Sequence, residues 1–367
     1  MYIRTVLLVV LAAALVFLFI HIRSHWRYRS YKVIEAEEVY DSVSEYVAMN
    51  GKVLRYSPDG ARLTDAEMKE EVWEESFSLT QPVAETMGDA VVLYDKRGTE
   101  IHVYNMEERL GVFATTSPIL FARAAGNGNV AVAVEDGEGT EIVYYNSQGE
   151  EIAAISPSAQ KYGYPLSMAV SLDGTMLAVA YVAADGGVIG SRLTFYNFGA
   201  AGQDKEDHVV AMEEFKGKLI PELRFSGKSE LLVFFDDGFT TYKGKTNPKR
   251  RETVKFDEEI VSVFCDESRI AFVFRCNEVG HRYRMDVYKH NGKQVEAEYV
   301  DIIYDKGHFS DGEIIFCNNN EMAIYTHNGH VRFSGSLDEG MISNVIKTGK
   351  NRYFVVTDSE AEIIKLR

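Results

Sequence analysis

The sequence has few of the residues that hold specialised folds together. Its 367 residues include only three cysteines, seven prolines and 29 glycines. Three cysteines are too few for a small disulfide scaffold, and the glycine and proline contents exclude collagen. A hydrophobic content of 46% is enough for a packed core, which excludes a disordered chain. Length alone allows two average domains or one large one.

Basic residues are also scarce. Lysine and arginine number 39 against 55 acidic residues, so the formal charge is −16. Phosphate binding needs a basic excess, and the composition therefore argues against nucleic-acid binding. The shortage is uneven, because residues 1–32 hold no acid and five basic residues: Arg4, Arg23, Arg27, Arg29 and Lys32. With 34 basic and 55 acidic residues left, residues 33–367 carry −21.

Long apolar runs are confined to this basic head. Residues 5–22 carry no Asp, Glu, Lys or Arg and number 18. As a helix they extend about 27 Å, enough to cross a hydrocarbon core. Trp26 and Tyr28 follow, where interfacial aromatics are expected. We interpret residues 1–30 as an uncleaved signal anchor in the cytoplasmic membrane with its basic flank.

Two questions about the head stay open. A cleaved signal peptide is the alternative to an anchor, but the small residues at 12–14 lie in mid-segment instead of at a cleavage site. More basic residues follow the segment than precede it, which places the body in the cytoplasm by the positive-inside rule. An acidic body is nevertheless easily translocated, so the residues alone leave the sidedness undecided.

The body repeats one pattern of four strand-like segments. Each unit has a strand-like stretch, a short apolar run, an alternating run and a third short run, separated by turns. The alternating runs end in Tyr104, Tyr145, Tyr196, Tyr242, Tyr288 and Tyr325. Asn-Gly pairs at 291–292 and 328–329 supply the positive φ of tight hairpins. The units fall at 44–78, 82–115, 119–156, 165–215, 219–256, 260–299, 300–336 and 341–367.

Units of about 42 residues with four strands are typical of propeller blades in WD40-like repeats. The sequence therefore predicts an all-β fold, an eight-bladed β-propeller over 31–367, with seven blades as the alternative. The last unit is one strand short. We expect residues 31–40 to pair with it and close the ring, since an open edge is unfavourable there. Only residues 66–75 resemble a helix, and they can equally form a charged loop.

Seven short motifs spread over nearly the whole chain carry a resemblance to known proteins. They are Leu54-Arg55-Tyr56-Ser57, Asp59-Gly60, Gly163-Tyr164-Pro165, Ser171-Leu172-Asp173-Gly174, Ser191-Arg192-Leu193-Thr194-Phe195-Tyr196-Asn197-Phe198-Gly199, Asn351-Arg352-Tyr353 and Ile364-Lys365-Leu366. With these motifs the chain resembles an uncharacterised family, a domain of unknown function in membrane-anchored, propeller-like proteins of anaerobic Gram-positive bacteria. The resemblance implies a body outside the cytoplasmic membrane, although the tail before the anchor is shorter here than in the family, and it implies no activity. More loosely, the blades resemble those of envelope assembly propellers and of quinone-cofactor dehydrogenases.

No catalytic, cofactor or metal motif stands out. The sequence has no nucleophile elbow, phosphate loop, dinucleotide fingerprint or Cys-x-x-Cys. His290 and His327 occupy the same repeat position in adjacent units, so we interpret them as solvated turn residues that do not converge on one ion. Cys265 and Cys276 flank a hairpin whose register pairs Cys265 with Ile270, which argues against a disulfide. Acidic turns such as 236–238 lack the spacing of a calcium loop.

Two groups of residues remain as candidate sites. Glu85, Arg123, Glu222 and Arg224 lie on the predicted innermost strands, where they either hold a ligand or pair across the channel; we favour pairing. Loops at 162–165 and 200–207 are the candidate partner-binding regions, since function concentrates in loops on a rigid scaffold. The residues proposed for partner binding are Tyr162, Tyr164, Arg192 and Asn197.

These observations favour a non-enzymatic, membrane-tethered scaffold or ligand-sensing module of the cell envelope. It would contact the cytoplasmic membrane through residues 5–22 and bind a protein partner, with no nucleic acid and no cofactor. An envelope enzyme with glycan or quinone-cofactor chemistry in the central channel is the alternative, and it requires convergent polar groups there.

Overall fold

The computed structural model describes Leu11 and residues 26–38, 43–137, 139–155, 163–337 and 340–367. The predicted anchor at 5–22 therefore lies outside the described residues, apart from Leu11. Within the described part, no helix has the length and apolarity needed to cross a membrane.

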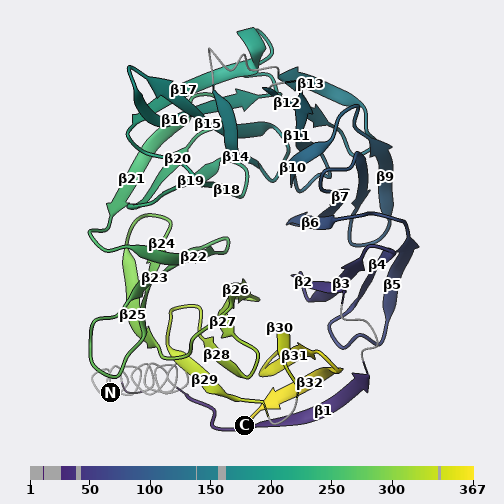
Figure 1. Ribbon diagram of the computed structural model, residues 1–367, viewed down its shortest axis with the longest axis vertical. Helices are drawn as coiled ribbons and strands as arrows, with labels where there is room; N and C mark the ends of the chain where they lie inside the picture. Colours follow the sequence, from purple (N-terminus) through teal and green to yellow (C-terminus); the bar gives the residue numbers. More distant parts are fainter. Residues whose placement is uncertain (1–10, 12–25, 39–42, 138, 156–162, 338–339) are drawn as a thin grey trace, which may run out of the picture.

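Eight four-stranded antiparallel sheets form a closed ring around a central axis, which confirms the eight-bladed propeller (Figure 1). Blade 1 has β2 (Glu45–Met49), β3 (Lys52–Ser57), β4 (Gly60–Asp65) and β5 (Glu71–Ser76), and blade 2 has β6 (Pro82–Met87), β7 (Ala90–Asp95), β8 (Glu100–Tyr104) and β9 (Arg109–Ala114). Blade 3 has β10 (Ile119–Ala124), β11 (Val130–Asp136), β12 (Gly139–Tyr145) and β13 (Glu151–Ile155), and blade 4 has β14 (Tyr164–Val170), β15 (Met176–Asp185), β16 (Val188–Asn197) and β17 (Val209–Lys216).

The second half of the ring repeats this arrangement. Blade 5 has β18 (Glu222–Ser226), β19 (Glu230–Phe235), β20 (Gly238–Lys243) and β21 (Lys249–Lys255), and blade 6 has β22 (Ile260–Cys265), β23 (Arg269–Arg275), β24 (Tyr283–Lys289) and β25 (Gln294–Val300). Blade 7 has β26 (Lys306–Ser310), β27 (Glu313–Cys317), β28 (Glu321–Tyr325) and β29 (Val331–Ser336), and blade 8 has β30 (Ile342–Gly349), β31 (Arg352–Thr357), β32 (Glu360–Leu366) and β1 (Tyr31–Glu38). One short 3₁₀ helix, η1 (Glu206–His208), lies between β16 and β17.

The antiparallel order gives the ring two faces. The first strand of each blade is innermost and the fourth is outermost (Figure 1). We define the proximal face as the face that carries two turns of each blade: the turn between the first and second strands and the turn between the third and fourth strands. The distal face has the turns between the second and third strands and the connections between blades. β1 begins at the proximal face, because Tyr31 pairs with Leu366 at the end of β32.

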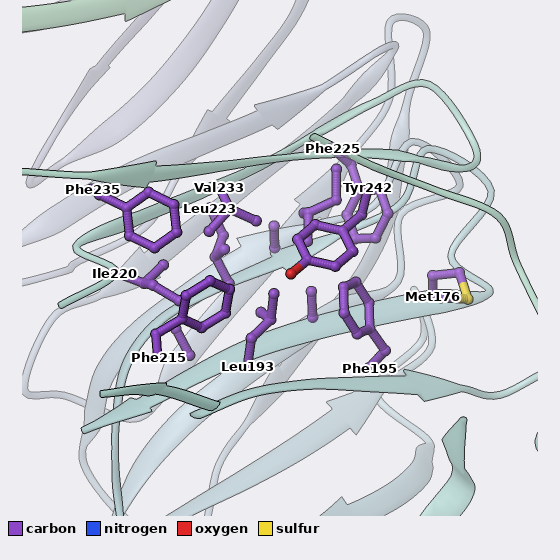
Figure 2. Packing of buried hydrophobic residues seen from close by; sticks show 14 residues of the cluster. Met176, Leu193, Phe195, Phe215, Ile220, Leu223, Phe225, Val233, Phe235 and Tyr242 are labelled. Carbon is purple, nitrogen blue, oxygen red and sulfur yellow. The ribbon is translucent and has the colours of Figure 1, made fainter. Parts of the chain in front are cut away.

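Neighbouring blades pack face to face through apolar side chains. In Figure 2, Phe195 and Phe215 of blade 4 lie against Phe235 and Tyr242 of blade 5. The ring centroids are 5.1 Å apart for Phe215 and Phe235 and 5.2 Å for Phe195 and Tyr242. Second and third strands are buried on both sides, which explains why their sequences read as continuous apolar runs.

The repeated tyrosines at the ends of third strands connect the blades. Tyr325 of blade 7 donates its hydroxyl proton to the carbonyl oxygen of Tyr299 in blade 6 at 2.9 Å. The Tyr242 hydroxyl of blade 5 donates to the Glu213 carboxylate of blade 4. Burial raises the pKa of both phenols, so they stay protonated and act as donors. A buried tyrosine can therefore fill the gap between blades and still satisfy its polar atom.

Blade 8 is completed by strands from both ends of the described chain. β1 pairs antiparallel with β32 from Tyr31 opposite Leu366 to Glu38 opposite Glu360. Before β1, the backbone N–H groups of Tyr28 and Arg29 donate to the carbonyl oxygens of Arg332 and Arg367 at 2.7 and 3.0 Å. Asn344 of blade 8 donates to the Tyr46 carbonyl of blade 1 at 2.8 Å. The ring thus has no unpaired blade.

One stretch differs from its sequence interpretation. Residues 66–70 form a turn, with the Lys69 N–H donating to the Asp65 carboxylate at 2.7 Å, and β5 follows from Glu71. Trp73 stacks on Tyr104 of blade 2 at 4.5 Å and donates its indole proton to the Asn105 carbonyl at 3.1 Å. Packing against the next blade therefore overrides the local helical preference of this acidic stretch.

The turn Ser171–Gly174, one of the family-like motifs, ties blade 4 to blade 5. The Asp173 carboxylate accepts hydrogen bonds from Ser171 Oγ at 2.9 Å and Thr175 Oγ1 at 2.8 Å. Lys245 of blade 5 forms an ion pair with the same carboxylate. Burial acts to raise the pKa of Asp173, but the hydrogen bonds from Lys245, Thr175 and Ser171 outweigh it and lower the pKa to about 2.

Ile364→Ala tests ring closure. Ile364 is fully buried on β32 between blades 7 and 8, so we expect its truncation to lower the free energy of unfolding by about 3 kcal/mol. Urea denaturation followed by circular dichroism measures the change. Ile34→Ala is the control, because Ile34 is 47% exposed on β1 and its truncation should change stability by less than about 0.5 kcal/mol. Equal effects of the two variants would contradict the described packing.

Asp173→Asn tests the link between blades 4 and 5 through pH. A lowered folded-state pKa means that Asp173 stabilises the fold above pH 4 and loses this contribution as the pH falls towards 2. We expect the wild type to lose about 1 kcal/mol more than Asp173→Asn over this range, after allowance for solvent screening. Denaturation midpoints measured between pH 5 and pH 2.5 would show parallel curves if the carboxylate had no such role.

Candidate functional site

The inner strands of the blades surround a central channel. Glu85 lies on β6, Arg123 on β10, and Glu222 and Arg224 on β18. All four side chains line one cavity with a volume of 480 Å³. A second cavity of 620 Å³ shares Thr86, Arg224 and Phe309 with it, so the two form one continuous space. The channel is open and is not filled by apolar side chains.

Two of the four charged residues pair directly. Arg123 Nη1 lies 2.9 Å from Glu85 Oε1, and the side chains are each 25% exposed. Burial raises the pKa of Glu85, the neighbouring Arg123 charge opposes this, and the Glu222 charge adds to it. The guanidinium therefore offsets only part of the effect of burial on the pKa of Glu85. The pair joins blade 2 to blade 3 at the channel wall.

The other two charged residues are not brought into a pair. Among the described residues, neither Glu222 nor Arg224 has an ion-pair partner within 4 Å. Arg224 Nη1 instead lies 3.5 Å from Cys265 Sγ on β22. Burial raises the pKa of the Cys265 thiol, so it is a neutral neighbour. Blade 5 therefore offers the channel an acid and a guanidinium that can still interact with a ligand.

The histidines connect neighbouring blades. His327 Nε2 of blade 7 lies 3.0 Å from Asp266 Oδ2 of blade 6. His290 of blade 6 lies 3.8 Å from Glu230 of blade 5 and is only 7% exposed, so its interpretation as a solvated turn residue was wrong. The turn that carries His290 packs against the preceding blade, and this contact buries the imidazole. Throughout the described part of the chain, no three His, Cys, Asp or Glu side chains are placed to hold a metal ion.

The cysteines follow the predicted register. Cys265 pairs with Ile270 across the β22–β23 hairpin, and all three cysteines are free. Cys317 is buried, whereas Cys265 and Cys276 are partly accessible. Cys265 is the one that lines the channel cavity beside Arg224.

The structure does not bring the four partner-binding candidates together. Tyr162 lies outside the described residues, and Tyr164 is 53% exposed at the distal end of β14. Arg192 forms an ion pair with Glu214 at 2.8 Å on blade 4. Asn197 is 3% exposed at the proximal end of β16, where its amide donates to the Lys245 carbonyl at 2.9 Å. The candidates are separated because of the strand order: the loops 162–165 and 200–207 connect to opposite ends of the blade 4 strands.

Blade 4 instead presents a hairpin that was not recognised from the sequence. β15 and β16 are ten residues each, the longest strands described. Their last two pairs, Ala184 with Ile189 and Asp185 with Val188, extend beyond the pairing with β14 and β17. Val188 and Ile189 are 50% and 60% exposed. The sequence feature that could have revealed this hairpin is the pair Gly186-Gly187, which forms a turn between two long runs without proline.

Exposed apolar side chains gather at the distal face. Ten of the 17 large exposed hydrophobic residues lie in its turns and connections or at the adjoining ends of inner strands, while none lies in a proximal turn of the described chain. Blade 4 and the connection after it contribute half of these ten. The ten are Val43, Tyr164, Leu166, Val188, Ile189, Leu219, Val261, Val279, Ile303 and Met341.

Comparison with solved structures shows the same fold in unrelated sequences. The crystal structure of BamB from Moraxella catarrhalis is 11% identical, with a TM-score of 0.54 over 92% of this chain and 100% of that one. Saccharomyces cerevisiae Sqt1 is 10% identical, with a TM-score of 0.55 over 93% and 98%. A structure described as the eukaryotic initiation factor is 12% identical, with a TM-score of 0.54 over 93% and 87%. These identities show the fold alone.

Comparison with sequence families is more specific. No curated protein matches the chain. The model of a family of unknown function, DUF5711, matches residues 24–366, which is nearly all of the described ring. The chain therefore belongs to this family.

Proposed function

We propose that this member of the family of unknown function DUF5711 is a membrane-tethered, non-enzymatic propeller that binds a protein partner at the bacterial cell envelope. The observation that carries the proposal is the gathering of exposed apolar side chains on the distal face, with half of them at blade 4 and the connection after it. Exposed apolar side chains that cluster on one face are typical of interaction sites. Single exposed residues would carry no such meaning.

The hairpin of blade 4 is suited to a partner contact. Among the described residues, no third strand pairs with the β15–β16 ribbon beyond Val182 on one side and Gly190 on the other. Open, apolar strand edges without lysine or proline favour pairing with another chain. Tyr164 and Leu166 lie at the same end of the blade and add apolar area beside this edge. A partner strand or loop would therefore find both hydrogen bonds and apolar contacts.

The proposed tether leaves this face free. If residues 5–22 cross the membrane, the chain reaches the ring at Tyr28 and Arg29, which bind at the proximal ends of β29 and β32. The distal face lies at the opposite ends of the same strands. We place the ring outside the cytoplasmic membrane, in line with the family resemblance and with an acidic body that is easily translocated.

The channel favours a second candidate function, namely ligand binding or chemistry within the ring. Its support is the open cavity with the polar groups of Glu222 and Arg224. We rank it second because Glu85 is engaged by Arg123, which leaves Glu222 without a second free carboxylate among the four residues. Hydrolysis of a glycoside needs two such groups facing one bond.

Photo-crosslinking in cells tests the distal face. We expect a crosslinking amino acid at Val188 of the full chain to form a discrete adduct with one envelope protein. The double variant Val188→Asp with Ile189→Asp should reduce capture of that partner at least about tenfold, because both side chains would need to bury charge at the contact.

The matched control carries the crosslinker at Lys228, an exposed residue of a proximal turn in the next blade. Adducts of equal yield at Val188 and Lys228, or adducts unaffected by the double aspartate variant, would refute a partner site on the distal face. Circular dichroism verifies that the variants fold.

Protease treatment of intact cells tests the tether and its sidedness. We expect the full chain to fractionate with membranes and its ring to be degraded by external protease only after the cell wall is removed. A ring that stays intact in spheroplasts but is digested after lysis would place the body in the cytoplasm. Recovery of the chain in the soluble fraction would contradict the tether.

A further inference from the structure

We infer that the proximal corner of blade 8, together with residues 26–32, forms a basic patch that docks on the anionic headgroups of the membrane holding the anchor. The inference rests on the proposed tether and adds a lipid-binding surface to it. We call this surface the blade 8 patch. It consists of six exposed basic residues: Arg27, Arg29, Lys32, Lys350, Lys365 and Arg367.

Backbone pairing brings these six residues together from two distant parts of the sequence. Lys32 on β1 lies directly opposite Lys365 on β32. The Arg29 N–H donates to the Arg367 carbonyl at 3.0 Å, and the Arg367 N–H donates to the Ser30 carbonyl at 2.8 Å. The Leu366 N–H donates to the Asn351 carbonyl at 2.9 Å, which places the turn containing Lys350 beside them. Figure 1 shows β1 running beside β32.

The patch differs from the other basic residues of this corner. Arg332 pairs with Glu313 at 3.1 Å, and Arg352 pairs with Glu67 of blade 1. None of the six patch residues has an ion-pair partner among the described residues. Lys32 and Lys365 face each other across the strands, an arrangement that repels unless an anion lies nearby. In a chain of net charge −16, six cations without ion-pair partners in one place call for an external anionic partner.

Chain length places the patch near the membrane. Only residues 23–27 separate the predicted span from Tyr28, whose N–H is bound to the Arg332 carbonyl at 2.7 Å. Five residues extend at most about 18 Å, so the corner of blade 8 cannot lie far from the headgroups. Trp26, 60% exposed within this short link, has the amphipathic ring that is enriched at membrane interfaces.

The form of the patch favours a surface over a small anion site. Its residues come from a link, two strands and a turn, and none of them lines any of the cavities described above. Diffuse basic surfaces attract anionic bilayers within about one Debye length, roughly 10 Å at 0.1 M salt. Docking through this corner would also fix the ring with its distal face directed away from the bilayer.

Hydrogen exchange of the full chain in nanodiscs tests the inference. We expect amides of residues 26–30 and of the turn 349–351 to exchange at least about threefold more slowly in phosphatidylglycerol discs than in phosphatidylcholine discs. The difference should disappear in 0.5 M NaCl, because salt screens surface charge. The variant Lys32→Glu, Lys350→Glu, Lys365→Glu should lose it at low salt.

The matched control is Lys96→Glu, Lys249→Glu, Lys255→Glu, which changes net charge equally at exposed positions on blades 2 and 5. The control should retain the protection. Equal exchange in both lipids, in chains that do insert into discs, would overturn the lipid contact and leave the tether intact. Failure of the chain to enter discs would overturn the tether and this inference together. Protection produced in phosphatidylcholine discs by inorganic phosphate alone would identify a free-anion site and also overturn it.

Discussion

Every blade of this protein depends on having a neighbour on each side. Its central strands are apolar on both surfaces, so a blade at the end of an open row would expose one of them to water. The pairing of β1 with β32 removes this end, because it completes blade 8 and presses it against blade 1. Channel, distal face and blade 8 patch all take their positions from this closure. Tyrosine hydroxyls, histidines and carboxylates between blades then fix the angle of each contact.

The ring could be predicted because its pattern repeats, while the single features could not. Apolar runs recur in all eight units and terminal tyrosines in six of them, so errors in one unit are corrected by the others. β5 was obscured because Glu71 and Glu74 give it helical character, and only contact with Tyr104 reveals the strand. The burial of His290 depends on how its turn meets the preceding blade. Contacts of this kind between units do not produce a periodic pattern in the sequence.

The candidate site was predicted in part for the same reason. Their position on the innermost strands was enough to place the four charged residues in the channel, since alternate side chains of an inner strand point towards the axis of the ring. The partner-binding candidates failed as a set because closeness in the sequence does not determine which face of the ring a residue lies on. Tyr164 and Asn197 belong to the first and third strands of blade 4 and lie at opposite ends of the blade. The division into basic head and acidic body also changes, because Arg29 and Lys32 stand among the last residues of the ring.

Closure by β1 and β32 has a consequence for how the protein is made. The partners Tyr31 and Leu366 are separated by almost the whole chain, so this pairing joins the two ends of the described ring. Blades 1 to 7 consist of consecutive strands and can form while translation proceeds, whereas blade 8 must wait for the last strand to leave the ribosome. During this interval β1 has no strand to pair with, and the two end blades of the incomplete arc each keep one apolar face uncovered. Folding therefore ends with a single late step that closes the ring. Before this step the open arc depends on protection from aggregation, and afterwards the closed ring does not.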